Sequence, residues 1–237
     1  MSVLAAGEIK IGEHVTRKFL GLTFNVDTIW TTVIAGSILV ALGLYMRYRL
    51  THGTPSKLQL AFETVVDAVQ KQVQDTIGPV APFVVPLAVT LFFFILIANW
   101  LEIIPSGHSP EYLPAPTADV NLTFALAFLV VGWATVTGIR RRGVGGYAKH
   151  FVRPSPALLP INIIEEVAKP FSLALRLFGN LFAGGVVLSL ITLLPPYLLP
   201  VLNVPWKLFD MAIGLIQAFI FALLTILYFA LSVGEGH

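Results

Sequence analysis

Five long apolar segments constrain the fold of this chain more than any other feature of its sequence. A helix needs about 20 residues to cross the roughly 30 Å of hydrocarbon in a bilayer. Because lipid offers no hydrogen-bond partners to an open backbone, apolar segments of this length cross it as helices. The segments comprise residues 28–46, 83–104, 120–139, 170–194 and 208–233. We therefore expect an all-α membrane protein with five transmembrane helices.

Composition agrees with a membrane protein and excludes several other classes. Hydrophobic residues make up 56% of the 237 residues and charged residues only 12%, whereas soluble domains carry about 25% charged residues. A formal net charge of +2 is too small to indicate a polyanionic partner, so we expect no nucleic-acid binding. The sequence has no cysteine, which excludes disulfides and thiolate metal sites. It also has no phosphate loop, zinc-ligand spacing or nucleophile motif, so we expect no cofactor and no metal.

Residues 54–77 differ from the five spans, because their pattern predicts an amphipathic helix. Thr54 followed by Pro55 is a typical helix start. The polar face is not rich in lysine or arginine, so we expect this helix at the cytoplasmic membrane surface, packed on protein or on lipid. Its apolar positions recur every three or four residues, at Leu58, Phe62, Val65, Val69, Val73 and Ile77.

Basic residues predict how the chain is oriented, since lysine and arginine concentrate in cytoplasmic loops. The segment 105–119, between the second and third spans, contains neither residue. We therefore expect the N-terminus outside and the C-terminus in the cytoplasm, although Lys10, Arg17 and Lys18 oppose the rule. The other loops carry Arg47, Arg49, Lys57 and Lys71 after the first span, and Arg140, Arg141, Arg142, Lys149 and Arg153 after the third.

The last two spans are expected to form a helical hairpin. Each has about 25 residues and is therefore roughly 38 Å long, which exceeds the hydrocarbon thickness and predicts a strong tilt. Pro195 and Pro196, with Pro200 and Pro205, are expected to end one span and introduce the next. We interpret residues 1–237 as a single membrane domain. It comprises an outer segment at 1–27, the amphipathic helix at 54–77 and the main candidate functional region at 158–233.

Arg176 lies deep inside the fourth apolar segment, where a charge is costly. Its guanidinium keeps its proton at any relevant pH, so it must find acceptors or a counter-ion. On a helix, Arg176 shares one face with Gly179, Asn180 and Ala183. Small residues let another helix approach closely, which is typical of a docking surface. The alternative, an arginine snorkelling to the interface, is less favoured because Arg176 is six residues inside Pro170.

Asp210, Gly214 and Gln217 form a similar stripe in the last span. Gln217 can bond a guanidinium or a carboxylate, or it can simply link two helices. A carboxylate at Asp210 must face water or a polar group in the membrane, unless it lies at the outer interface beside Trp206 and Lys207. The stripe is therefore a second candidate for chemistry.

Acidic residues also flank these two spans. Glu165 and Glu166 precede the arginine on its expected cytoplasmic side, where adjacent acids can exchange protons with water. The alternative is a helix pair between Glu165 and Lys169. On the outer side Asp119 begins the third span, where it can line a wet vestibule or cap the helix. Asn121, Asn99 and Glu102 are further candidates for such a vestibule.

Several runs of sequence carry a resemblance to a known family. They are LALRLFGN at 173–180, NIIEE at 162–166 and QAFIFALLT at 217–225, with ADVN at 118–121 and FLGLTFN at 19–25. Together they resemble subunit a of the bacterial F-type ATP synthase, and the likeness covers nearly the whole chain in segment order.

The resemblance implies a non-catalytic stator subunit in the bacterial plasma membrane. Such a subunit provides two offset aqueous half-channels beside a c-ring, a rotating ring of small helical hairpins with one buried carboxylate each. The implied ion is H⁺, with Na⁺ less favoured, and its flow is coupled to ATP synthesis. Peripheral-stalk b-type subunits are implied as further partners. Residue by residue, the resemblance makes Arg176 the essential arginine, Asn180 and Gln217 its polar neighbours, Glu165 and Glu166 cytoplasmic half-channel acids, and Asp119 an outer half-channel acid.

One departure from the family concerns the outer half-channel. Many members have a carboxylate where this chain has Gly185, and a histidine where it has Asp210. The outer acid is therefore expected to have moved across the hairpin to Asp210. A self-contained ion or solute transporter, with Arg176 as an anion site, is the alternative function. It predicts inverted repeats or broken helices, and the sequence shows no repeat.

Overall fold

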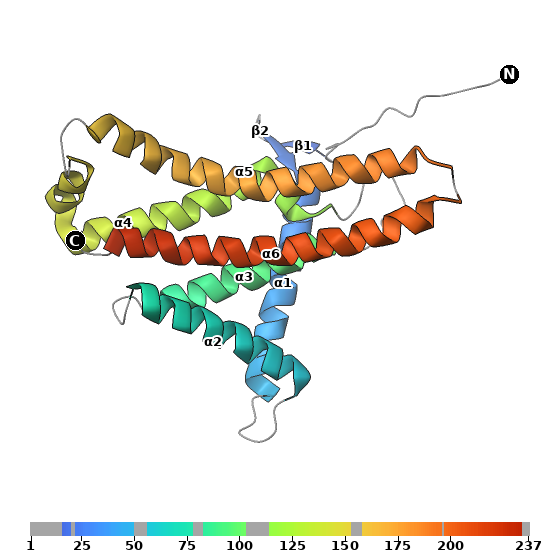
Figure 1. Ribbon diagram of the computed structural model, residues 1–237, viewed down its shortest axis with the longest axis horizontal. Coiled ribbons are helices and arrows are strands. Elements are labelled where there is room, and N and C mark those ends of the chain that lie inside the picture. The colour runs from blue at the N-terminus through green and yellow to red at the C-terminus, as the bar shows by residue number, and fades with distance from the viewer. Residues whose placement is uncertain are drawn as a thin grey trace.

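The computed structural model describes residues 16–19, 22–49, 56–77, 83–102, 114–152, 158–195 and 197–233, and it is predominantly helical. Five helices are long and apolar enough to cross a membrane, and α2 is amphipathic. The predicted all-α membrane fold is confirmed (Figure 1). The helices are α1 (Val26–Arg49), α2 (Lys57–Ile77), α3 (Val84–Leu101), α4 (Val120–Val152), α5 (Leu159–Thr192) and α6 (Leu199–Val233), with a 3₁₀ turn, η2 (Pro116–Ala118), before α4.

A short antiparallel β-hairpin precedes α1, and the sequence analysis did not predict it. It consists of β1 (Thr16–Phe19) and β2 (Leu22–Asn25), with Thr16 paired to Asn25 and Phe19 to Leu22. Only four residues form each strand. A run this short carries too little periodicity to be distinguished from a loop.

The helices α5 and α6 form the predicted hairpin, but both begin earlier than expected. Pro170 lies inside α5 and Pro205 inside α6, rather than at their first residues. Proline removes one backbone hydrogen bond, and neighbouring helices can compensate for that loss inside a membrane. Each helix therefore extends by about two to three turns beyond the predicted start.

The hairpin helices are longer than a bilayer is thick. Helices of 34 and 35 residues are roughly 51 Å long, whereas the hydrocarbon is about 30 Å thick, so they tilt or extend beyond it. In Figure 1, α5 and α6 lie side by side and α1 runs across them. If α1 spans the membrane upright, this crossing corresponds to the predicted strong tilt of the hairpin.

The apolar core lies where α3, α4, α5 and α6 meet. Ile95 of α3, Leu173 of α5 and Phe221 and Phe229 of α6 are all almost completely buried. Close contact between α4 and α6 depends on Gly138, because a Cβ there would lie 2.9 Å from the backbone oxygen of Ser232. The core holds the tilted hairpin against α3 and α4.

The apolar face of α2 packs on α3 and α6 of its own chain. Val69 and Val73 are buried, and the ring of Phe62 stacks on Phe93 with centroids 5.0 Å apart. Of the two alternatives, packing on protein or on lipid, the structure therefore shows packing on protein. Leu58 is the exception, since it is 51% exposed. The predicted cap at residues 54–55 lies outside the described residues.

A single residue, Gly143, interrupts α4. Its φ of 71° and ψ of 162° belong to a region that only glycine occupies readily. The chain changes direction there, so the last turns of α4 are a separate short helix that follows Arg142. This kink brings Tyr147 toward α5, where its hydroxyl bonds Glu166.

We expect Gly143→Ala to destabilise the protein by about 1–3 kcal/mol, because alanine is strained at this φ and ψ. Gly145→Ala is the matched control, since a Cβ meets no atom within 4 Å at either position and only Gly143 has a positive φ. Thermal unfolding of the purified protein in detergent would measure the difference. Equal melting temperatures for the two variants would contradict the strain.

Candidate functional site

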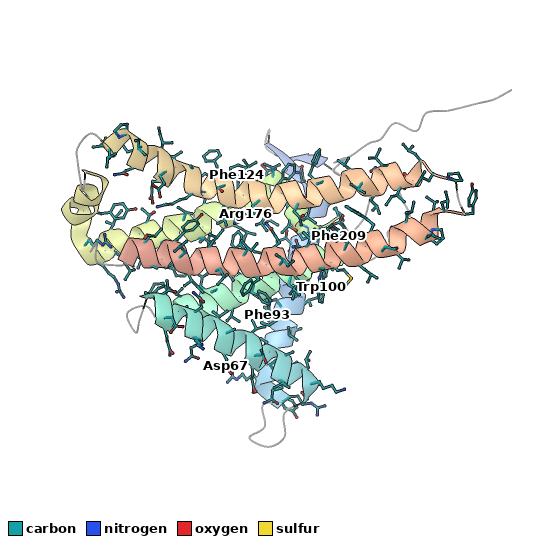
Figure 2. All side chains as sticks on the ribbon, in the orientation of Figure 1. Asp67, Phe93, Trp100, Phe124, Arg176 and Phe209 are labelled. Atoms are coloured by element: carbon teal, nitrogen blue, oxygen red, sulfur yellow. The ribbon has the colours of Figure 1, made fainter. Side chains whose placement is uncertain are left out.

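Arg176 lies about midway along α5 (Figure 2), and its side chain is exposed in the part of the chain that the structure describes. Gly179 and Ala183 are exposed with it, whereas Leu173 and Leu177, on the adjoining side of the helix, are buried. The predicted face of small and polar residues is therefore present and uncovered. It is the natural place for a second helix from another chain to pack.

No residue of the described part of the chain forms a hydrogen bond or ion pair with the guanidinium of Arg176. The hydroxyl of Tyr228 on α6 is near enough to feel its charge. Neighbouring Asn180 has an amide nitrogen, Nδ2, that is buried without a hydrogen-bond partner. An unpaired cation and an unsatisfied donor thus lie within one turn of each other.

The stripe on α6 faces into the bundle instead of toward lipid. Gly214 is packed against Asn99 of α3, whose Nδ2 donates to the Gly214 carbonyl oxygen at 3.3 Å. Gln217 is only 7% exposed. Asp210 is half-buried, one turn nearer the tip of the hairpin. The structure therefore places all three residues of the predicted stripe on one inward-facing side of α6.

Asp210 lies in a small recess between α5, α6 and the end of α3. Its Oδ1 is 3.0 Å from the position that a Cβ on Gly184 would occupy, so the carboxylate rests on the bare backbone of α5. Lys207 is close enough to interact with it electrostatically. The recess is lined by Glu102, Gly184, Leu188, Trp206, Lys207 and Asp210. It brings together two carboxylates that the sequence analysis had placed on separate helices.

Glu166 is bound at the opposite end of the hairpin, whereas Glu165 beside it is exposed. Lys169 Nζ forms an ion pair with Glu166 Oε2 at 2.6 Å. Tyr147 donates its hydroxyl to Glu166 Oε1 at 3.1 Å, and Thr135 approaches the same oxygen at 3.5 Å. The alternative pairing of Glu165 with Lys169 is therefore wrong, because Lys169 bonds the acid three residues before it. Glu166 links α5 to both parts of α4.

Asp119 is buried at the start of α4, where its carboxylate accepts at least four hydrogen bonds, from Asn25, Thr28 and Asn121. The backbone N–H of Asn121 donates to Oδ1 at 2.7 Å, which is the helix cap that its position suggested. The Asn121 side chain donates to Oδ1 at 3.0 Å. Asn25 Nδ2 and Thr28 Oγ1 each donate to Oδ2 at 2.7 Å. Both oxygens are thus occupied by groups of the protein.

Fold and site together define a multi-pass membrane protein whose tilted hairpin presents an unpaired arginine. The family described as ATP synthase A chain matches residues 28–230. The chain is 55% identical to ATP synthase subunit a of Acidothermus cellulolyticus over 232 residues, which cover 98% of this chain and 85% of that protein. It is 48% identical to the Mycobacterium bovis subunit a over 245 residues, covering 99% and 98%, and 36% identical to subunit a 1 of Photobacterium profundum over 249 residues, covering 96% and 95%. The chain belongs to the family of ATP synthase subunit a.

Several polar residues of these clusters were not singled out from the sequence. Thr135 lies in a lipid span and Tyr147 in the basic segment that follows it, and Thr28 and Thr117 lie at helix starts where threonine is common. A hydroxyl at such a position usually bonds its own backbone. Only the tertiary structure shows which ones bond across helices.

We expect Glu166→Gln to lower the melting temperature, because it removes an ion pair and weakens a cross-helix hydrogen bond, for about 1 kcal/mol at a partly exposed site. Glu165→Gln is the control, since Glu165 is exposed on the same turn. Thermal unfolding at neutral pH would compare the two. An equal fall in melting temperature in both variants would show that the bonds of Glu166 do not stabilise the protein.

Proposed function

We propose that this chain is the proton-translocating stator subunit of an F-type ATP synthase, and is not itself catalytic. It provides two offset aqueous half-channels that lead protons to and from carboxylates on a rotating c-ring. The observation that carries the proposal is the uncovered, unpaired Arg176 on a face of small residues. Family membership and the tilted hairpin support it.

The permanent charge of Arg176 suits it to separate the two half-channels. An arginine cannot release its proton, so it cannot relay one, but it repels a hydronium ion and attracts an ionised carboxylate. Two unit charges 4 Å apart attract by about 4 kcal/mol at an effective dielectric near 20. That energy favours ionisation of a passing ring carboxylate without trapping it irreversibly. Asn180, with its unsatisfied amide, and Gln217 are the proposed polar neighbours.

The two clusters at the ends of the hairpin are the proposed access routes. Glu165 and Glu166 belong to the cytoplasmic route, with exposed Glu165 as the group that exchanges protons with water. Asp210, in the recess with Glu102, is the proposed last group of the outer route. Asp119 takes no part in this proposed route, because its oxygens already accept four hydrogen bonds. This assignment puts the N-terminus outside and the C-terminus in the cytoplasm.

The proposed partners occupy different surfaces. The c-ring faces the exposed side of α5 that carries Arg176 and Gly179. The peripheral-stalk b-type subunits meet the outward side of α2 and helices that do not face the ring. They cannot use the apolar stripe of α2, because its own chain covers that stripe. H⁺ is the proposed ion. Each charge that crosses releases about 2.3 kcal/mol per 100 mV, so several crossings are needed for one ATP.

Arg176→Ala should abolish ATP-driven proton pumping in inverted vesicles and permit a passive proton leak, because the barrier between the half-channels is lost. Arg176→Lys should not restore pumping, since a buried lysine can lose its proton and lacks the planar fork. Arg140→Ala, which removes an exposed arginine of α4, is the control and should pump normally. Normal pumping by Arg176→Ala would refute the proposal, and transport by the purified chain alone would favour the self-contained transporter.

Asp210→Asn should lose pumping, because the last group of the outer route can no longer carry a proton. Gly185→Glu in the same chain should restore part of it, since a Cβ at Gly185 meets no atom within 4 Å. Gly184→Glu is the steric control and should not restore pumping, because its Cβ would lie 3.0 Å from the residue 210 side chain. Full pumping by Asp210→Asn alone would exclude Asp210 and return Asp119 as the candidate.

A further inference from the structure

Buried polar side chains form a network that crosses the bundle near η2. Its first part centres on Asp119, which joins the start of α4 to the end of β2, through Asn25, and to the start of α1, through Thr28. Thr28 is 7% exposed and Asp119 only 4%. Because these groups are hidden from water, each bond that is lost leaves a donor or an acceptor unsatisfied.

The second part of the network reaches α6. Thr117 of η2 is fully buried and donates its Oγ1 to Asn99 Oδ1 of α3 at 2.6 Å. Asn99 Nδ2 in turn donates to the carbonyl oxygen of Gly214 at 3.3 Å. A Cβ on Gly214 would lie only 3.1 Å from Asn99 Cβ, so α3 and α6 touch at this point. Thr117 and Asp119 are two residues apart, which connects the two parts through η2.

Gly214 lies between the two residues of α6 to which a role in proton transfer is assigned. Asp210 is four residues before it and Gln217 three residues after it, on the same side of the helix. Long helices packed by apolar side chains can slide along one another by small shear motions. A directional hydrogen bond at Gly214 opposes such sliding, because it fixes one carbonyl oxygen of α6 to one side chain of α3.

We propose that Asn99, Thr117 and Asp119 are positioning residues that fix α6 along its axis relative to α1 and α3. Asp119 ties η2 to α1, Thr117 orients the Asn99 amide, and the amide holds Gly214. The network thereby sets the height of Asp210 and Gln217 relative to Arg176 without carrying protons itself. Its consequence for pumping rests on the proposed function, whereas its effect on the position of α6 does not.

Thr117→Val tests the network by removing one hydroxyl at nearly constant volume. Thr123→Val is the matched control, since Thr123 is also fully buried but its Oγ1 donates at 2.9 Å to Val120 of its own helix. Amide hydrogen exchange of the assembled complex should become roughly fivefold faster at residues 199–214 in Thr117→Val, the factor expected for one lost hydrogen bond. The Thr123→Val variant should exchange like the parent. Thr117→Ser, which keeps the hydroxyl, should restore both slow exchange and pumping.

The possible outcomes separate the parts of the proposal. Unchanged exchange in Thr117→Val would overturn the network, and faster exchange with undiminished ATP-driven pumping would overturn its positioning role. If Arg176→Ala pumps normally, the proposed function fails, but the exchange result still decides the network. If Thr117→Val does not assemble, Thr28→Val replaces it, with buried Thr31→Val as control because Thr31 bonds only the backbone of α1. Thr28→Val should then speed exchange at residues 114–119, and no change there would overturn the link to α1.

Discussion

The permanent charge of Arg176 is the constraint on which the organisation of this membrane protein depends. Burial cannot neutralise a guanidinium, and the described part of its own chain supplies no counter-ion. The side chain is therefore stable only where water solvates it or another molecule provides a negative partner. An open face on α5, small residues beside the charge and a core on the adjoining side of the helix all agree with a partner from outside the chain.

The acidic residues divide into two kinds according to what their oxygens bind. Asp119 accepts four hydrogen bonds, and Glu166 is held by Lys169 and Tyr147, so both connect helices. Asp210 lines a recess and Glu165 is exposed, so both remain open to exchange. In a bundle with few charges, an acid that anchors helices and an acid that exchanges protons require opposite surroundings. The sequence places both kinds at helix ends and does not distinguish them.

Much of the fold could be predicted from the sequence, because apolar segments that cross a bilayer form helices, so that segment length and residue periodicity give the elements. The five spans, the amphipathic helix α2 and the polar face of α5 follow from apolar runs and from spacings of three and four. The early starts of α5 and α6 could not be predicted, since Pro170 and Pro205 are strong breakers in water but tolerated between packed helices. Periodicity also gives the face of the helix on which a residue lies, but it does not give the residue that bonds it from another helix. The hydrogen bonds of Glu166 and Asn99 could therefore not be predicted.

The tilt of the hairpin explains how acids at different places along it serve separate routes in the proposed mechanism. Along α5, Glu165 precedes Arg176 by eleven residues, which is roughly 16 Å of helix. In a helix parallel to the membrane normal, that distance would be a difference in membrane depth only. The two access routes would then lie one above the other along the normal. In a strongly tilted helix much of it becomes lateral displacement. In the proposed mechanism, groups near the two ends of the hairpin then reach a passing ring at different positions, with Arg176 between them, and this geometry couples rotation to proton transfer.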